Sequence, residues 1–391
     1  MLEIRPANAA YMVIATVPVA RSPNEVRVNS ITNTVYVSNW NGGSVSVING
    51  TTNTVTATIP VQGRPPNGLG VNETTNTIYV ASTNDDILNV ISGATNTITT
   101  TISLTGNPWA VDVNPITNTV YVTRSNFNLV SVIDGVTNTV TTTIPVGIYP
   151  TALVVNPTTN TIYVANRYDS TISVIDGATN TVTATVPVGG AFPLAVGVNP
   201  TTNTIYVPNY LSNTLSVIDG TTNTLTMTIP VGLFPHGIGV NPITNTIFVN
   251  IQSGNPSVSV IDGATNTVIE SIPVGLSPNG STIGVNPMTN TIYVANSGSD
   301  TVSVLRDIIP TDTPTPTATN TASPTPSLTP TTTLVPTIID QPRETVTPIA
   351  ISQLPSTGYP PSNQRDDSLR IVVAVGLMIL AIGIYYRRKP R

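Results

Sequence analysis

The chain carries one histidine, His236, and no cysteine among its 391 residues. A histidine can act as a general base, but this role needs an orienting partner or a metal site, and this composition offers little for either. His236 is therefore expected to be an exposed residue at the rim of a surface. We expect no catalytic residue, no metal site and no cofactor.

Four aspartates, Asp134, Asp176, Asp219 and Asp262, each stand before a glycine and lie 42 or 43 residues apart. Carboxylates of this kind are possible calcium ligands. Each one belongs to a different copy of a sequence repeat, however, and Asp-Gly is explained by the geometry of a tight hairpin turn. We interpret the four aspartates as turn residues.

The aspartates recur because the chain is built from repeats. A segment such as Asn-Pro-Thr-Thr-Asn-Thr-Ile-Tyr-Val-Ala-Asn, at 156–166, occurs in seven close copies. Their middle aromatic residues are Tyr36, Tyr79, Tyr121, Tyr163, Tyr206, Phe248 and Tyr293. The spacings between them are 43, 42, 42, 43, 42 and 45 residues. A period near 42 that contains only short strands is the length of one four-stranded propeller blade.

Each repeat predicts four strands, which we name A to D and which fall at 153–156, 161–165, 171–175 and 181–188 in one copy. Strand B is apolar without alternation, as a strand buried on both faces would be. Strand D alternates Thr with Val or Ala, which is typical of a strand with one wetter face. We therefore expect strand A innermost and strand D outermost in each blade.

The last repeat has no strand D before the Pro/Thr-rich sequence begins, but residues 11–19 match strand D of every later copy. Pairing these two ends would close a ring and remove the open sheet edges. The predicted fold is all-β: a seven-bladed propeller of four-stranded antiparallel blades, closed by the N-terminal strand and covering residues 1–309.

The recurrent Thr-Asn-Thr-Val/Ile-Tyr-Val segment, followed by Ser-Val-Ile-Asp-Gly, resembles the YVTN family of β-propeller repeats. This family occurs in bacterial and archaeal cell-surface proteins. The resemblance spans residues 11–305 and implies a seven-bladed propeller with a surface role. It supplies no catalytic residues.

The loops divide into two sets. The A–B and C–D turns fall on one face and hardly vary between repeats, whereas the B–C and D–A loops, on what we call the variable face, differ in every repeat. The variable face collects aromatic and charged residues, a composition typical of binding surfaces. The candidate binding residues are Trp40, Arg64, Trp109, Arg124, Arg167, Tyr168, Tyr210 and His236. Tyr149, Phe192 and Phe234, which precede the D–A prolines, could instead fill gaps between blades.

Charge argues against nucleic acid as a partner. Residues 1–309 hold seven arginines and fourteen acidic residues, a net charge of −7. Nucleic-acid binding needs a basic surface.

The sequence changes character after the repeats. Residues 310–353 are rich in Pro, Thr and Ser with no apolar period, so a disordered stalk is expected. Residues 354–391 begin with Leu354, Pro355, Ser356, Thr357 and Gly358, continue through a polar spacer and an apolar run at 371–386, and end in a basic tail. This order resembles the sorting signal of sortase-anchored surface proteins. The resemblance implies that a sortase cuts after Thr357 and joins it to the cell envelope, with 371–386 in the membrane before processing. A plain single-span tail anchor is the alternative.

These observations together predict a cell-surface propeller, anchored to the cell wall or membrane and extracellular, that acts as a non-enzymatic binding, adhesion or envelope-structural module. The expected partners are the sortase and an extracellular protein or glycan. Residues 1–10 lack the pattern of a secretory signal, so we expect an export signal upstream. The alternative function is a lactonase-like or lyase-like propeller enzyme with its site at the channel mouth.

Overall fold

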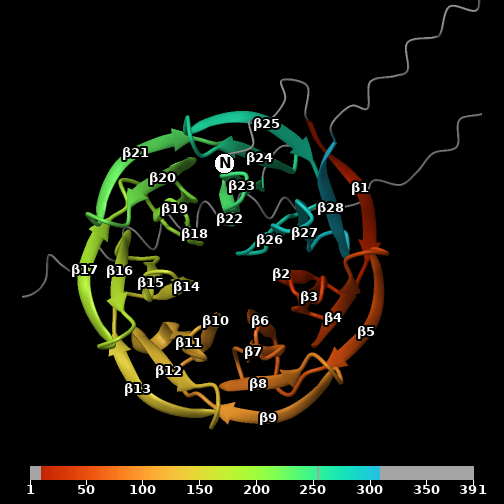
Figure 1. The fold of residues 1–391 in the computed structure, drawn as a ribbon, viewed down its shortest axis with the longest axis vertical. Helices are drawn as coiled ribbons and strands as arrows, with labels where there is room; N and C mark the ends of the chain where they lie inside the picture. Colours follow the sequence, from red (N-terminus) through yellow and green to blue (C-terminus); the bar gives the residue numbers. More distant parts are fainter. Residues whose placement is uncertain (1–9, 253–254, 309–391) are drawn as a thin grey trace, which may run out of the picture. The chain divides into compact units, whose positions relative to one another are not determined.

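A computed structural model describes residues 10–252 and 255–308. Within these residues the strands form seven four-stranded antiparallel sheets around a central channel (Figure 1). The predicted stalk and sorting signal lie outside the described residues. Among the described residues, no helix is long and apolar enough to cross a membrane.

Seven blades follow one another around the ring, each with its strands in the order A to D from the channel outwards. Blade 1 comprises β2 (Pro23–Asn29), β3 (Thr34–Asn39), β4 (Ser44–Asn49) and β5 (Thr54–Pro60). Blade 2 comprises β6 (Pro66–Asn72), β7 (Thr77–Ser82), β8 (Ile87–Ser92) and β9 (Thr97–Ser103). Blade 3 comprises β10 (Pro108–Asn114), β11 (Thr119–Arg124), the 3-10 helix η1 (Ser125–Phe127), β12 (Leu129–Asp134) and β13 (Thr139–Pro145). Blades 4 and 5 comprise β14 (Pro150–Asn156), β15 (Thr161–Asn166), β16 (Thr171–Asp176) and β17 (Thr181–Pro187); and β18 (Gly197–Asn199), β19 (Thr204–Asn209), β20 (Thr214–Asp219) and β21 (Thr224–Pro230). Blades 6 and 7 comprise β22 (Pro235–Asn241), β23 (Thr246–Ile251), β24 (Ser257–Asp262) and β25 (Thr267–Pro273); and β26 (Gly284–Asn286), β27 (Thr291–Asn296), β28 (Thr301–Ile308) and β1 (Ala10–Pro18).

The N-terminal strand closes the ring, as the sequence predicts. Blade 7 has the order β26, β27, β28, β1, and β1 pairs antiparallel with β28 from Ala10 opposite Ile308 to Pro18 opposite Thr301. The sheet that would otherwise end at β28 is thereby completed by the other end of the propeller. No blade is left with three strands.

The burial of each strand agrees with its predicted place in the blade. In blade 4, the middle of β15 is fully buried, and the threonines of β17 are exposed. The alternation of β17 is less marked than the sequence suggests, because Val182 is still 36% exposed and only Val186 is buried on its inner side. The outermost strand packs against one neighbouring strand alone, so its apolar side is covered only near its end.

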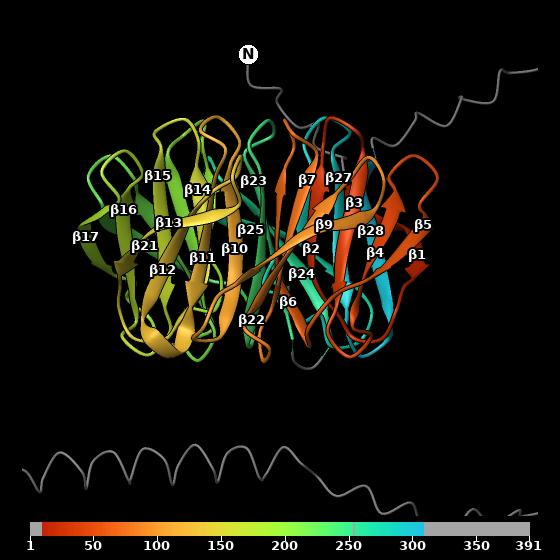
Figure 2. The same ribbon diagram turned by 90° about the horizontal axis from the view of Figure 1, so that it is seen from below.

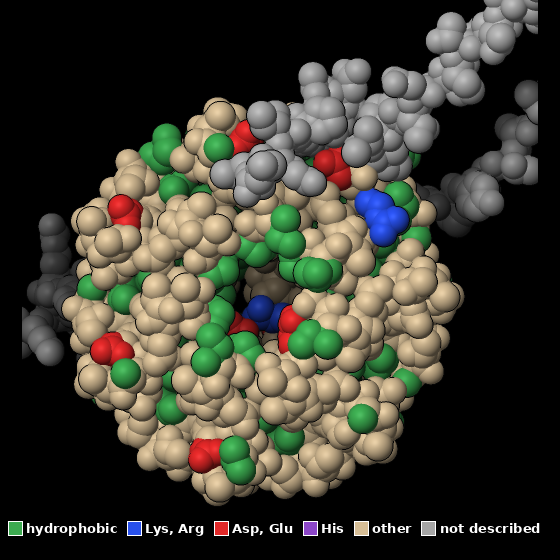
Figure 3. Space-filling model, in the orientation of Figure 1, with side chains coloured by type: hydrophobic (Ala, Val, Ile, Leu, Met, Phe, Trp, Pro, Cys, Tyr) green, Lys and Arg blue, Asp and Glu red, His purple; other side chains and the backbone are tan. Residues whose placement is uncertain are grey.

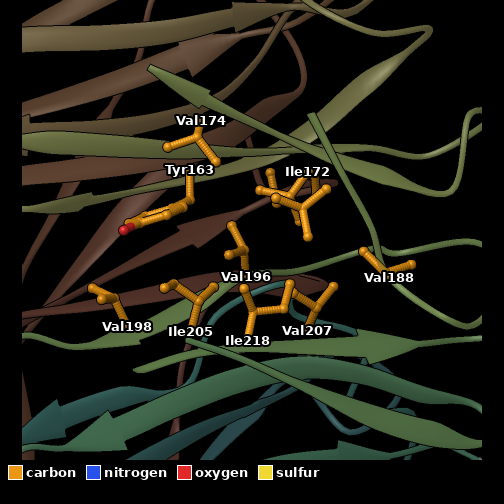
Figure 4. Packing of buried hydrophobic residues seen from close by; sticks show 12 residues of the cluster. Tyr163, Ile172, Val174, Val188, Val196, Val198, Ile205, Val207 and Ile218 are labelled. Atoms are coloured by element: carbon orange, nitrogen blue, oxygen red, sulfur yellow. The ribbon is translucent and has the colours of Figure 1, made fainter. Parts of the chain in front are cut away.

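Interblade packing is carried by the repeated aromatic residue and its aliphatic neighbours. Tyr163 is 1% exposed and lies between Val174 of its own blade and Val198 of the next (Figure 4). Burial raises the pKa of its hydroxyl to about 12. Equivalent aromatic residues fill the same place in the other six blades, and each is at most 1% exposed.

A ring of asparagine hydrogen bonds links every blade to the next. The asparagine that ends strand A donates from Nδ2 to the Oδ1 of an asparagine in the A–B turn of the following blade, at 2.7 to 2.9 Å. The pairs are Asn29–Asn76, Asn72–Asn118, Asn114–Asn160, Asn156–Asn203, Asn199–Asn245, Asn241–Asn290 and Asn286–Asn33. All seven donors are fully buried. The repeated asparagines therefore hold the ring together in addition to forming its turns.

The two faces of the disc are set by the direction of the strands, which run between them (Figure 2). Because each blade is an antiparallel meander, the A–B and C–D turns share one face and the B–C and D–A loops share the other. On the variable face the inner strands approach closely at the channel. A Cβ on Gly280 would lie 2.0 Å from the carbonyl oxygen of Asn24 in blade 1, which explains the glycine there.

Candidate functional site

The loops of the variable face share one backbone scaffold. In each blade the residue after strand B donates its N–H to the carbonyl of the residue before the D–A proline, at 2.8 to 3.3 Å. The donors are Trp40, Thr83, Ser125, Arg167, Tyr210, Gln252 and Ser297. The backbone is constant while the side chain changes, so this position carries six residue types in seven blades, with serine in two of them. By channel mouth we mean these seven residues together with those that directly follow the D–A prolines.

Three D–A loops hold an aromatic residue in the left-handed conformation. Tyr149, Phe192 and Phe234 have φ values of 57°, 60° and 55°. Bulky residues rarely adopt this conformation, and asparagine or glycine would adopt it at a lower cost. Strain of this kind concentrates at functional sites. It favours a role for the aromatic rings beyond turn formation.

The aromatic residues of the variable face form a continuous arc from blade 1 to blade 5. The ring centroid of Trp40 lies 6.1 Å from that of Trp109, and Trp109 lies 6.5 Å from Tyr149. Tyr149 lies 4.9 Å from Tyr168, which lies 5.6 Å from Phe192. Tyr149 and Phe192, two of the residues before the prolines, thus do both things that the sequence left open: they pack, and they belong to the same aromatic surface as the two tryptophans.

A second aromatic group lies beside this arc, with Arg167 acting on both. Tyr210 lies 5.1 Å from Phe234 and 6.1 Å from His236. The Arg167 guanidinium carbon lies 5.0 Å from the ring centre of Phe192, a cation–π contact. The charge of Arg167 also lowers the pKa of His236, although burial is the larger cause. Arg167 is therefore within electrostatic reach of the second group.

His236 is partly buried, and not fully exposed as the sequence suggested, because it packs edge-on against Tyr210. Burial lowers the pKa of the imidazole to about 4, and a backbone hydrogen bond at Gly280 acts in the opposite direction. The ring is consequently neutral at pH 7. Its Nδ1 has no hydrogen-bond partner among the described residues, and no group of three or more metal-ligating side chains occurs among them.

Two of the predicted arginines contact loop residues. Arg124, the last residue of β11, donates from Nε to the Thr105 carbonyl and from Nη2 to Thr105 Oγ1 at 2.8 Å. Arg64 is exposed and lies against Gly43, whose Cβ would come within 2.8 Å of its Nε. The structure therefore brings together Trp40, Trp109, Arg167, Tyr168, Tyr210 and His236, whereas the contacts described for Arg64 and Arg124 are with loop residues.

Several loop acids of the variable face have structural roles. Asp85 accepts a hydrogen bond from the Arg64 N–H at 2.7 Å, and Asp169 accepts one from the Ile148 N–H at 2.6 Å. Asp86 does the same for Asn107 and Asp300 for Ser22. These carboxylates stabilise the loops, which leaves the aromatic rings and Arg167 as the groups free to meet a ligand.

A charged cluster in the channel was missed by sequence reasoning. Arg27 of β2 donates from Nε to the Leu69 carbonyl at 2.9 Å, and its Nη1 lies 3.7 Å from Asp112 Oδ1 of β10. Arg27 lines a cavity of about 210 Å³ together with Glu73, and the remaining wall is largely aliphatic, with Val154, Val198 and Ile238 among its residues. Figure 3 shows basic and acidic side chains inside the central opening. Because Arg27 already pairs within the protein, we assign this cluster to bridging blades 1 to 3.

Glu25 is the buried carboxylate of the same region. Its Oε2 accepts the Leu69 N–H of blade 2 at 2.7 Å, and its Oε1 accepts Ser281 Oγ of blade 7. The equivalent residues in the other blades are all small: Gly68, Ala110, Ala152, Ala195, Gly237 and Gly280. Aligning the repeats at this position is the sequence signal that would have found Glu25.

The buried Glu25 carboxyl should make stability depend on pH. Burial raises the pKa of Glu25 above its ordinary value of 4.5, against the opposing effect of Arg27. A raised folded-state pKa means that folding disfavours the charged form, so the stabilising contribution is complete below 4.5 and is lost as the pH rises through the folded pKa. We expect the free energy of unfolding to fall over that range, and to fall less in Glu25→Gln.

Urea denaturation from pH 4 to pH 8 measures this dependence. Glu73→Gln, which removes a partly exposed carboxyl bonded to Ser30, is the matched control and should keep the wild-type slope. Equal slopes in the wild type and Glu25→Gln would show that Glu25 does not titrate as described.

Comparisons with known proteins support the fold alone. No protein-family model matches the chain, and no curated protein matches it. Among solved structures, the chain is similar to hydrazine synthase from Kuenenia stuttgartiensis, with 19% sequence identity and a TM-score of 0.67. The match covers 73% of this chain and 96% of that chain. The similarity extends to the β-propeller architecture, and the resemblance of the repeats to the YVTN family stays a prediction from the sequence.

Proposed function

We propose that this protein is a non-enzymatic binding module of the cell surface, which recognises an extracellular partner with the channel mouth of its variable face. The arc of aromatic rings from Trp40 to Phe192 is the observation that carries the proposal. Large aromatic residues and arginine dominate binding energy at protein surfaces. The opposite face is made of near-identical turns and offers no comparable variety of side chains.

Exposure supports the same face. Tyr168 is 50% exposed and Phe234 is 38% exposed, although both rings contact other rings. Aromatic residues that are already positioned by neighbours lose little conformational freedom on binding, which makes them effective anchors. The variable face around the mouth therefore combines accessible apolar area with a fixed geometry.

The double change Trp40→Ala and Trp109→Ala tests the proposal. Loss of two aromatic anchors should weaken binding by about 2 kcal/mol or more, roughly 30-fold in Kd. Trp109 also packs against the core of blades 3 and 4, so the melting temperature should fall, and binding is compared at a temperature at which the variant is fully folded. Binding of the purified full chain to whole cells and to protein and glycan arrays gives the readout.

The matched control is Ile116→Ala with Ile243→Ala, two exposed residues of the A–B turns on the other face. These changes should leave binding unaltered. A similar loss from both pairs, with the fold intact in each, would move the binding site away from the variable face.

The competing function is a lactonase-like or lyase-like enzyme that uses His236 as its base. An imidazole with a pKa near 4 is a weak base at pH 7. Its Nδ1 has no partner within the described residues to orient it. Turnover of a lactone or uronate substrate that disappears in His236→Ala would replace the binding proposal with this one.

Surface display is proposed from the C-terminal sequence, which supplies the Leu354–Gly358 motif, the apolar run and the basic tail in the order of a sorting signal. In that case the mature protein ends at Thr357, joined through its carbonyl to an envelope fragment, and stays with the wall fraction in hot detergent. Mass spectrometry of the native C-terminal peptide checks this. Peptides that run through Gly358 in most of the surface protein would instead identify a retained membrane anchor, as would full detergent extraction of a Thr357→Ala variant and the wild type alike.

A further inference from the structure

The channel mouth contains polar atoms that the fold leaves unpaired. Six of its side chains, at the two positions that vary between blades, have a buried nitrogen or oxygen without a hydrogen-bond partner in residues 10–252 and 255–308. They are Asn67 Nδ2, Thr83 Oγ1, Arg167 Nε, His236 Nδ1, Gln252 Oε1 and Asn279 Oδ1. Each such atom costs roughly 1 to 3 kcal/mol when it stays unpaired, so a cluster of them calls for an explanation.

These atoms differ from the other unpaired atoms of the propeller. Most of the others are asparagine oxygens that recur at one turn position or at the end of strand B in blade after blade, such as Asn138 and Asn180. The atoms at the mouth come from different residue types, and two of them, in Asn67 and Thr83, belong to side chains that are only 2% exposed. Repetition of the blade sequence therefore does not account for them.

The kinds of atom restrict the ligand. Asn67 Nδ2 and Arg167 Nε are donors, Gln252 Oε1 and Asn279 Oδ1 are acceptors, and a hydroxyl or a neutral imidazole can be either. A phosphate or carboxylate would satisfy only the donors, and a hydrocarbon chain would satisfy none. Groups that both donate and accept, at close and regular intervals, satisfy the whole set, and hydroxyls are such groups.

The aromatic rings add the second requirement, a flat apolar ligand face. The ring planes of Trp40 and Trp109 are inclined by 58°, and those of Trp109 and Tyr149 by 53°, so the rings do not cover one another face to face. A sugar ring has a C–H face for such a surface and hydroxyls around its edge. Apolar walls with a few placed polar groups are the general design of small-molecule sites.

We propose that the ligand of the channel mouth is a carbohydrate, an inference that rests on the function proposed above. One sugar ring lies on Trp109 and Trp40, and the hydroxyls of the ligand pair with the unpartnered atoms of the mouth. Arg167 Nε makes one of these bonds. The guanidinium remains stacked on Phe192, so it can serve a neutral sugar through this donor or a uronic acid through its charge.

The experiment uses the full chain and an array of defined oligosaccharides of glucose, mannose, galactose, N-acetylglucosamine and glucuronate. Binding to at least one class is expected. Trp109→Ala and Gln252→Ala should each weaken it about tenfold or more, whereas Trp109→Phe should keep most of it. Arg167→Gln should reduce glucuronate binding far more than neutral-sugar binding if the acid is the ligand, and both alike if the sugar is neutral.

The experiment must also distinguish a carbohydrate ligand from a protein partner. Exposed aliphatic residues surround the mouth farther out, Leu233 at 55% and Leu276 at 60% among them, and a protein would contact these as well. Leu233→Ala with Leu276→Ala should therefore leave carbohydrate binding unchanged. Periodate oxidation of target cells should abolish binding, while protease treatment should spare it.

The two proposals fail in different ways. Binding to protease-sensitive, periodate-resistant cell material that still depends on Trp40 and Trp109 would overturn the carbohydrate ligand and keep the binding face. Carbohydrate binding that persists unchanged in Trp109→Ala and Gln252→Ala would overturn the site itself. Cell binding that is indifferent to both tryptophans would overturn the function proposed for the face.

Discussion

A chain that lacks residues 1–20 is expected to lose several kcal/mol of stability and to aggregate at concentrations at which the full chain stays monomeric. The deletion removes β1, which supplies the outermost strand of blade 7 along the whole of β28. Tyr11 and Val17 are 3% and 2% exposed in that strand, and burial of a large apolar side chain is worth about 1.5 to 3 kcal/mol. The exposed edge of β28 then becomes a template for pairing with other chains.

Thermal unfolding and light scattering of the truncated chain measure the effect. Deletion of residues 1–9, which ends before β1 begins, is the control and should change neither readout. A synthetic peptide of residues 10–20 added to the larger truncation should restore part of the stability by pairing with β28. An unaltered melting temperature after removal of residues 1–20 would contradict the closure of the ring by β1.

The second large effect is expected at the hydrogen bond that closes the asparagine ring. Asn286 donates from Nδ2 to Asn33 Oδ1 at 2.8 Å and accepts from the Met288 N–H at 3.0 Å, and its side chain is fully buried. Asn286→Ala leaves an acceptor and a donor without partners. At about 1 to 3 kcal/mol for each such group, the change should cost about 2 to 6 kcal/mol of unfolding free energy.

Asn286→Asp distinguishes the contributions of the two hydrogen bonds. The aspartate keeps an acceptor for Met288 but directs an oxygen at the Asn33 oxygen, so at pH 7 it should destabilise at least as much as alanine. Asn84→Ala, in an exposed loop, is the control and should lie within about 0.5 kcal/mol of the wild type. If chemical denaturation places Asn286→Ala in that range too, the asparagine ring does not hold the blades together.

The number of blades and the closure of the ring were predictable because both follow from the spacing of the sequence repeats. Seven aromatic residues at near-constant spacing give the number of blades, and the missing strand D after 301–305 identifies residues 11–19 as its replacement. The repeats can be aligned with one another, so features that recur in every repeat can be predicted without knowing which residues are close in space. The same holds for the division into a constant and a variable face.

The asparagine ring was only half predictable. The sequence marks Asn156 and Asn203 as turn residues, but they lie 47 positions apart and meet only because adjacent blades stand at a fixed angle. No local sequence pattern specifies the angle between adjacent blades. Likewise Arg124 and Arg167 stand one position apart in the repeat, and only the folded chain reveals that Thr105 holds one while Phe192 stacks on the other.

Features that occur in one blade alone are the hardest to predict from the sequence, because each appears only as a single departure from the repeat. Glu25 and Arg27 stand in an ordinary apolar strand, and a single charged residue there reads as surface variation. Their partners, Ser281, Leu69 and Asp112, come from three other blades. The pairing is therefore a property of the closed ring and has no trace in any one repeat.

The direction of β28 decides how the propeller would meet its surroundings. The strand starts at Thr301, next to the B–C loop of the variable face, and ends at Ile308, on the face of the A–B and C–D turns. Ile308, the last described residue of the propeller, thus lies on the side opposite the aromatic arc. A pulling force applied at Ile308 would act along a strand flanked by β27 and β1. The hydrogen bonds of β28 to both neighbours would then resist the load together, and ring closure by β1 would double the number of strands that share it.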